Sequence, residues 1–314
     1  MSKGGGRRGA GRWLAWFAWF GGALIGAAAL WTLRGQWRAA SVLAGTLDIE
    51  WGLVIVSGAI VLGAYGILVV TWRACVADTG ASLPLSESAR IWFVSNLARY
   101  IPGALWQMGA LAALARHQGT SATAATSAAF VLTVVHTLSG LAVVLVFGNA
   151  LASAPVPTWL PVLVGVAGLA ALRWVAPPVV RWIGARTGRA LRLPALSARL
   201  LGVTTVGSVL SWLAYGAAFK LFVAGTLPGV DLSFAAAIAI YAASYLAGFL
   251  SLGPPAGIGV ADGALVALLS AGGMATPGEA IVISVLTRLW RTTLEIAPGL
   301  AFLALQPSRG SRIP

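Results

Sequence analysis

Residues 96–103 read NLARYIPG, and residues 251–259 read SLGPPAGIG. Both are Pro/Gly interruptions inside hydrophobic sequence, and we name them the first break and the second break. Proline removes a backbone donor and clashes with the preceding helical turn, while glycine frees the backbone, so both segments interrupt a helix. In lipid, such an interruption persists only where protein or a water-lined cavity satisfies the freed groups. The breaks are therefore the first candidates for a working site. Their expected hinge residues are Pro102, Gly103, Pro254, Pro255, Gly257 and Gly259.

Composition places the chain in a membrane. Its 314 residues are 59% hydrophobic and only 9% charged, a balance far outside that of soluble globular proteins. The net charge of +13 does not indicate a nucleic-acid partner, because the basic residues form clusters between apolar stretches, as they do in cytoplasmic loops beside anionic lipid. We therefore expect one integral membrane domain over residues 1–314, with membrane lipids as partners and no nucleic acid.

The chain offers few groups that bind a metal or a cofactor. Cys75 is its single cysteine, so it cannot form an intrachain disulfide, and His117 and His136 are its two histidines. These residues do not form the clustered spacing of a zinc or iron site. We expect neither a metal nor a cofactor.

Apolar runs long enough to cross a bilayer alternate with short charged loops. The run at residues 13–33 follows a basic N-terminus, and its 21 residues exceed the roughly 7–15 of a signal-peptide core, so a retained span is favoured over a signal peptide. We expect an all-α polytopic transmembrane helix bundle of about eight spans, with broken or re-entrant short helices. The other apolar segments are residues 51–72, 86–118, 122–148, 159–174, 200–224, 232–252, 260–270 and 279–305.

Residues 173–199 carry six arginines and no acid. Basic loops stay on the cytoplasmic side, so this segment predicts a cytoplasmic position. Together with the basic start and end of the chain, it predicts a multi-pass protein of the cell membrane with both termini in the cytoplasm. The alternative role is recruitment of anionic lipid headgroups, which is worth about 1 kcal/mol per basic residue near the surface.

The two breaks belong to an internal repeat. Shifting the sequence by 154 positions gives 7 identities in the 17 positions from Gly103 to Gly119. Each unit, residues 86–148 and residues 232–305, holds a helix, a break, a short helix and a long span. The positive-inside rule starts the first unit in the cytoplasm and the second outside, so we expect an inverted repeat, a common plan of secondary transporters. The alternative is a duplicated hairpin that only packs the bundle.

Three charged residues share one face of the last span. Arg288, Arg291 and Glu295 are spaced i, i+3 and i+7. Each costs roughly 2.5–3.5 kcal/mol at the centre of a membrane helix, so they should face the protein interior. Arg291 and Glu295 can pair at i, i+4, which would leave Arg288 as the freer cation. Asp262, after the second break, is either the partner of Arg288 or a proton-coupled group.

Arg99 ends a polar helix face directly before Pro102 of the first break. The planar guanidinium suits a phosphate, so Arg99 is a candidate headgroup contact. Lys220 lies late in its span, where snorkelling to the surface is the favoured role. For His136, in the middle of a span, a hydrogen-bonded core position is favoured over a functional one.

The residues around both breaks resemble the transmembrane region of lysylphosphatidylglycerol synthases. The resemblance covers roughly residues 51–305, and Tyr-Ile-Pro-Gly at residues 100–103 is its most specific element. It implies a flippase-like function, since this region is regarded as the flippase of the synthases, and relatives are associated with polyprenyl-phosphate sugars and glycan assembly. The residues that carry it are Arg99, Tyr100, Ile101, Pro102, Gly103, Trp106, Gly119, Gly257, Ile258, Gly259, Val260, Arg288 and Glu295.

The chain departs from the family pattern after the second break. The family tends to show Gly-Val-Arg-Glu where this chain has Gly-Val-Ala-Asp at residues 259–262. Ala261 cannot contact a headgroup phosphate as an arginine would, whereas Asp262 still supplies an acid. The chain also ends nine residues after the predicted last span, so we expect no soluble aminoacyl-transferase domain and no lysine transfer.

These observations predict a transporter that moves an anionic phospholipid or a polyprenyl-phosphate-linked sugar between leaflets, without catalytic residues. A membrane enzyme acting on a lipid phosphate is one alternative, in which Asp262 and His136 would have to meet, although the motifs of serine hydrolases, P-loop proteins and zinc proteases are absent. An accessory subunit that holds a glycosyltransferase partner is the other. The expected substrate-binding residues are Arg99, Tyr100, Trp106, Asp262, Arg288, Arg291 and Glu295.

Overall fold

The computed structural model describes most of the chain after its N-terminal segment. The described residues are 48–100, 105–150, 157, 159–187, 194, 196–251 and 255–305. The predicted span at residues 13–33 lies outside them, as do the hinge positions Pro102, Gly103 and Pro254.

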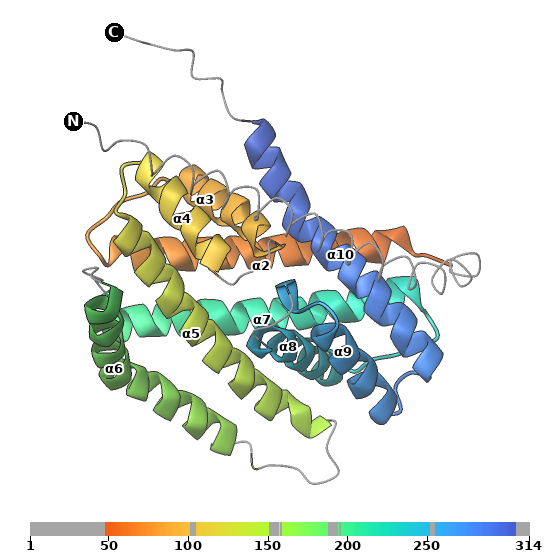
Figure 1. The fold of residues 1–314 in the computed structure, drawn as a ribbon. Helices are drawn as coiled ribbons and strands as arrows, with labels where there is room; N and C mark the ends of the chain where they lie inside the picture. The colour runs from red at the N-terminus through yellow and green to blue at the C-terminus, as the bar shows by residue number, and fades with distance from the viewer. Residues whose placement is uncertain are drawn as a thin grey trace, which may run out of the picture.

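The described residues form nine α-helices and three short 3-10 turns, and no strand. This confirms the all-α class (Figure 1). The helices are α2 (Trp51–Ala77), α3 (Leu85–Leu97), α4 (Leu105–His117), α5 (Ala122–Phe147), α6 (Trp159–Thr187), α7 (Ala198–Thr226), α8 (Phe234–Leu250), α9 (Val260–Ala271) and α10 (Pro277–Ala304). The 3-10 turns are η1 (Ala98–Tyr100), η2 (Gly148–Ala150) and η3 (Pro255–Gly257). By length and composition, α2, α5 and α7 are each able to cross a membrane, and α8 and α9 are shorter apolar helices.

Helices α2 and α7 lie side by side and antiparallel at the centre of the bundle (Figure 1). The amide of Glu50, just before α2, donates to the carbonyl of Gly225 near the end of α7 at 2.9 Å. A Cβ on Gly225 would meet the Cβ of Leu53 at 2.9 Å, and a Cβ on Gly207 of α7 would come still closer to Oγ1 of Thr71. Small residues therefore let the two backbones approach, as is common between membrane helices.

The predicted repeat units share their element order and a turn. The first unit is α3, η1, α4 and α5, and the second is α8, η3, α9 and α10. Two residues after the end of each short helix, α4 and α9, the chain turns at a glycine in the left-handed region: Gly119 (φ +74°) after α4 and Gly273 (φ +65°) after α9. In both, the residue after the glycine donates its amide hydrogen to the carbonyl oxygen of the residue four positions before the glycine, as in a Schellman motif. The opposed sense of the units across the membrane stays a prediction.

Helix α6 differs from its predicted length. We expected the span to end near Trp174, yet α6 continues to Thr187 with Pro177 and Pro178 inside it. Each proline removes one backbone donor, but the preceding turns contain alanine, leucine and arginine, which favour the helix. The first half of the basic segment 173–199 is therefore helical, and Arg173 and Arg181 are exposed on it.

Candidate functional site

A central cavity of about 380 Å³ lies inside the bundle, between α2, α3, α4, α5, α7, α8, α9 and α10. Its wall is rich in aromatic side chains. The chain has five tyrosines, of which four, Tyr65, Tyr215, Tyr241 and Tyr245, line the cavity. The fifth, Tyr100, bonds to one of the lining side chains. These four tyrosines lie in mid-helix positions, away from the interfacial ends where aromatic residues usually gather, and this pattern is the sequence signal that indicates the cavity.

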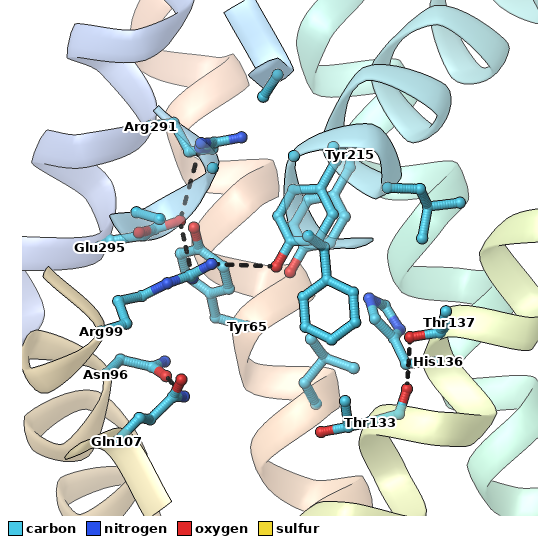
Figure 2. A pocket seen from close by; sticks show the side chains of 18 of the residues that line it. Tyr65, Asn96, Arg99, Gln107, Thr133, His136, Thr137, Tyr215, Arg291 and Glu295 are labelled. Carbon is cyan, nitrogen blue, oxygen red and sulfur yellow. Dashed lines mark hydrogen bonds and ion pairs between the residues drawn. The ribbon is translucent and has the colours of Figure 1, made fainter. Parts of the chain in front are cut away.

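One end of the cavity carries a charged cluster, which we name the arginine–glutamate cluster: Arg99, Arg291 and Glu295 (Figure 2). The carboxylate of Glu295 lies 3.4 Å from Nη1 of Arg99 and 3.7 Å from Nε of Arg291. It also accepts a hydrogen bond of 2.5 Å from the hydroxyl of Tyr100. Nη2 of Arg99 donates to the hydroxyl of Tyr245 at 3.5 Å, and the Arg291 guanidinium lies 5.5 Å above the Tyr245 ring.

The arginine–glutamate cluster is buried and has an excess of one positive charge. The side chains of Glu295, Arg291 and Arg99 are 5%, 11% and 20% exposed. Two guanidinium groups face a single carboxylate, and a buried ion is stable only when it is paired and hydrogen-bonded. The remaining guanidinium donors can therefore bind an anion that enters the cavity.

Close packing of α3 on α10 builds this cluster. Arg291 and Glu295 share a face of α10 because they are one turn apart. A Cβ on Gly299, one turn further along, would lie 2.9 Å from the Leu97 side chain and 3.0 Å from the carbonyl oxygen of Phe93. The absence of a side chain at Gly299 thus lets α3 approach α10 and brings Arg99 within reach of Glu295.

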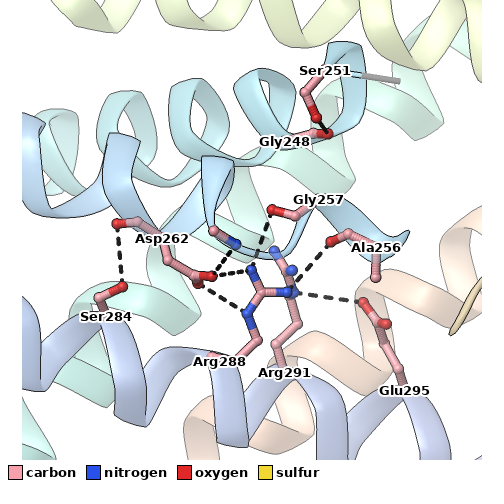
Figure 3. Close-up of polar contacts among 10 residues, drawn as sticks. Gly248, Ser251, Ala256, Gly257, Asp262, Ser284, Arg288, Arg291 and Glu295 are labelled. Carbon is pink, nitrogen blue, oxygen red and sulfur yellow. Dashed lines mark hydrogen bonds and ion pairs between the residues drawn. The ribbon is translucent and has the colours of Figure 1, made fainter. Parts of the chain in front are cut away.

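A second charged pair lies beside the second break (Figure 3). Arg288 donates from Nε and Nη2 to the two carboxylate oxygens of Asp262, at 2.9 Å and 2.6 Å. Its guanidinium also approaches the carbonyl oxygens of Ala256 at 3.4 Å and Gly257 at 3.5 Å. The amide of Gly259 donates to Asp262 at 2.8 Å. Arg288 of α10 therefore bonds to residues within and directly after the second break.

The prediction that Arg288 is the freer cation is wrong. Helical spacing relates only residues of one helix, and the partner of Arg288 comes from α9, 26 residues earlier. Of the two roles considered for Asp262, the structure shows the partner of Arg288. Lys220 directs its ammonium to the loop after α7, where it bonds the exposed Asp231 at 3.1 Å and the carbonyl of Leu232, in agreement with the expected position near the surface.

The second break has a strained backbone. Ala256 and Gly257 have φ values of +51° and +67°. The left-handed region costs a non-glycine residue about 1–2 kcal/mol. A Cβ on Gly257 would lie 2.7 Å from Cα of Gly248 in α8. Ala256, Gly257 and Gly248 all line the cavity, so the predicted hinge forms part of its wall.

Other polar side chains also line the cavity: Asn96 and Gln107 lie on the same side as Arg99, and His136 lies on α5 across from them (Figure 2). The ring of His136 stacks on Trp212, with centroids 4.5 Å apart and planes 11° apart. Asn96 accepts a 2.5 Å hydrogen bond from Gln107. The expected hydrogen-bonded core role of His136 is wrong for its Nδ1, which is buried and has no partner among the described residues.

The predicted substrate-binding residues thus fall into three places. Arg99, Tyr100, Arg291 and Glu295 meet at the charged end of the cavity. Asp262 and Arg288 pair with each other beside the second break, and neither is among the residues that line the cavity. Trp106 is half-exposed, at 46%, and is not among the residues that line the cavity.

Residues 18–299 match the family described as the lysylphosphatidylglycerol synthase TM region. The chain belongs to this family. The match confirms the resemblance and begins upstream of residue 51, where we placed its start. No curated protein and no solved structure matches the chain. Within this lysylphosphatidylglycerol synthase TM region lie both breaks, the arginine–glutamate cluster and the Asp262–Arg288 pair.

Proposed function

We propose that the protein moves a lipid with a phosphate-bearing headgroup between the leaflets of the cell membrane. The observation that carries the proposal is the central cavity, which places two arginines and one glutamate inside a hydrophobic bundle and is walled in part by the second break. Membership of the lysylphosphatidylglycerol synthase TM family supports a function that concerns membrane lipids.

A phosphate suits the charged end. Arginine has five donors in a planar fork and binds phosphate oxygens through paired hydrogen bonds. Arg99 uses one donor on Tyr245 and lies 3.4 Å from Glu295. A phosphodiester that joins Glu295 in the cluster would therefore neutralise the excess positive charge.

The broken helices favour movement over static binding. In secondary transporters, discontinuous helices meet near the membrane midplane and the substrate binds between two repeat units. Here the cavity lies between elements of both units, since Arg99 belongs to the first and Arg291 and Glu295 to the second. Rocking of one unit against the other would open the cavity to each leaflet in turn.

The alternatives have less support. A membrane enzyme that uses Asp262 and His136 needs the two side chains together, whereas Asp262 is held by Arg288 and only His136 lines the cavity. An accessory subunit that binds a glycosyltransferase would need no buried cationic site.

Reconstitution into liposomes tests the proposal. Vesicles containing fluorescent phosphatidylglycerol or a fluorescent polyprenyl-phosphate sugar are treated with an impermeant quencher, and the inner-leaflet signal is followed. We expect movement faster than in empty vesicles, a loss of at least tenfold in Arg99→Gln and Arg291→Gln, and unchanged rates in Arg181→Gln, whose side chain is exposed on α6. Rates equal to those of empty vesicles for both lipid classes would refute the transporter.

A further inference from the structure

We propose that Glu295 sets the charge of the anion that the central cavity binds, so that a group with one negative charge binds in preference to a group with two. This inference rests on the proposed function, because it concerns what binds at the arginine–glutamate cluster. It adds a specificity-determining residue and a rule that depends on the charge of the ligand and not on the identity of its headgroup.

The charged residues that line the cavity, within the part of the chain that the structure describes, are Arg99, Arg291 and Glu295 (Figure 2). Two guanidinium groups and one carboxylate leave an excess of one positive charge. The Asp262–Arg288 pair does not alter this excess, because its opposite charges meet at 2.6 Å and neither residue lines the cavity. The other described lining residues carry no charge at pH 7, where histidine is counted as neutral.

Three donors surround the Glu295 carboxylate. Nη1 of Arg99 lies 3.4 Å away, Nε of Arg291 lies 3.7 Å away, and the Tyr100 hydroxyl donates to it at 2.5 Å. A buried ion is stable only when it is paired and hydrogen-bonded, and these partners meet that condition for Glu295. Its negative charge therefore offsets one guanidinium group, and the charge of the other is left for a ligand.

Both arginines are within reach of a ligand in the cavity. The side chains of Arg99 and Arg291 are 20% and 11% exposed, although both lie inside the bundle, and both line the cavity. Neither contributes to the buried polar atoms that lack a partner, so each guanidinium nitrogen is either hydrogen-bonded or accessible. Because the two groups flank the same carboxylate, an anion that binds beside Glu295 lies near both.

A ligand with one negative charge brings the cluster to neutrality, whereas a ligand with two leaves a buried negative charge. Removing an unpaired charge from water is costly, and Coulomb attraction offsets this cost only when each charge has a partner. The nearby Arg288 cannot supply that partner, because both carboxylate oxygens of Asp262 occupy it. A phosphodiester or a sulfate monoester carries one charge, while a phosphomonoester carries about 1.5–2 at pH 7. The cluster therefore discriminates between these two kinds of group.

Competition binding to the purified full chain in an uncharged detergent tests the inference, at about pH 8.5, where a phosphomonoester is doubly charged. Fluorescent phosphatidylmethanol is the bound probe, and fluorescence anisotropy measures its displacement. Phosphatidylmethanol and phosphatidic acid with identical acyl chains form the first pair of competitors, which differ by one methyl group and one charge. Hexadecyl sulfate and hexadecyl phosphate form the second pair, which differ in charge at nearly constant size and shape. We expect the singly charged member of each pair to bind about tenfold more tightly, because it leaves no unpaired charge in the cavity.

Variants of Glu295 distinguish the charge rule from other effects. Glu295→Gln leaves two positive charges in the cluster, so we expect the preference to disappear or to reverse in favour of the doubly charged competitors. Glu295→Asp keeps the charge and should keep the preference. The double variant Arg99→Gln/Glu295→Gln returns the cluster to one positive charge, so it should recover the preference at lower affinity. It also leaves fewer guanidinium groups without a counter-charge, so it provides the test if Glu295→Gln alone unfolds.

Glu87→Gln is the matched control. It changes the charge of the protein by the same amount, but Glu87 pairs with Arg90 on α3 and does not line the cavity, so we expect the preference to be unchanged. Equal or tighter binding of the doubly charged member of either pair by the unmodified protein would overturn the inference. An unchanged preference in Glu295→Gln, or an altered one in Glu87→Gln, would do the same. Lipid movement without the charge preference refutes this inference alone, and the preference without lipid movement refutes the transporter alone.

Discussion

Glu295 is the residue on which the charged end of the cavity depends. Its carboxylate is 5% exposed and is shared by two arginines and the Tyr100 hydroxyl. Each arginine alone would be a buried, unpaired cation, which is far more costly than a buried pair. The glutamate therefore keeps the cavity stable while the excess positive charge remains available to a substrate.

Replacing Glu295 with glutamine keeps the volume and an acceptor for Tyr100 but removes the charge. We expect the free energy of unfolding to fall by about 3–5 kcal/mol, because both guanidinium groups lose their counter-charge. Thermal unfolding of the purified protein in detergent measures this change. The control is Glu87→Gln, which breaks a pair with Arg90 at 3.3 Å whose side chains are 24% and 31% exposed and should cost at most about 1 kcal/mol. Equal shifts in the two variants would show that the cluster is not a stability determinant.

The sequence placed Arg291 and Glu295 on one face correctly, because both belong to one helix of known period. It did not place Arg99 on Glu295, and it left the Asp262–Arg288 pair as one of two alternatives, since those pairs join residues 196 and 26 positions apart in the chain. It also did not predict that His136 and Asn96 line one cavity, because several helices form that cavity. Helical periodicity predicts which residues of one helix share a face, whereas contacts between different helices depend on how the helices pack.

At the scale of elements, residues 255–259 of the second break form a short turn held by specific contacts. Three contacts hold it: the carbonyls of Ala256 and Gly257 face Arg288, the amide of Gly259 bonds Asp262, and Gly257 packs against α8. Helix types and most boundaries followed from apolar runs and from the Pro/Gly positions. The end of α6 did not, because Pro177 and Pro178 lie inside the helix.

Substitutions at two glycines of the second break can distinguish the effect of backbone strain from the effect of close packing. Gly257 (φ +67°) and Gly259 (φ +85°) both require the left-handed region, yet a Cβ on Gly259 meets nothing within 4 Å, while one on Gly257 lies 2.7 Å from Gly248. We expect Gly259→Ala to lower the free energy of unfolding by about 1–2 kcal/mol, and Gly257→Ala to lower it by several kcal/mol and to slow lipid movement, since α8 must shift. Thermal unfolding and the liposome assay measure both effects. Equal losses would mean that strain alone governs this turn.

At the scale of the whole molecule, the two repeat units make one cavity. Arg99 and Gln107 come from the first unit, and Tyr245, Arg291 and Glu295 come from the second. In Figure 1, α5 descends to the lower right and α10 rises from the lower right, so the long helices of the two units run in opposite directions in that view. A shared site between opposed units would give each leaflet an equivalent route to the same charged cluster.

Matched positions at the ends of α4 and α9 test whether the units are inverted across the membrane. His117 and Ala271 are 154 residues apart, as the repeat requires, and both are exposed. Because the positive-inside rule places the first unit's turn in the cytoplasm and the second unit's turn outside, an impermeant maleimide added to intact cells should label Ala271→Cys, and should label His117→Cys only after permeabilisation. The background is Cys75→Ala, since Cys75 is the single cysteine of the chain. Labelling of both positions from one side would replace the inverted repeat by a duplicated hairpin, and the cavity would then need a different route to the second leaflet.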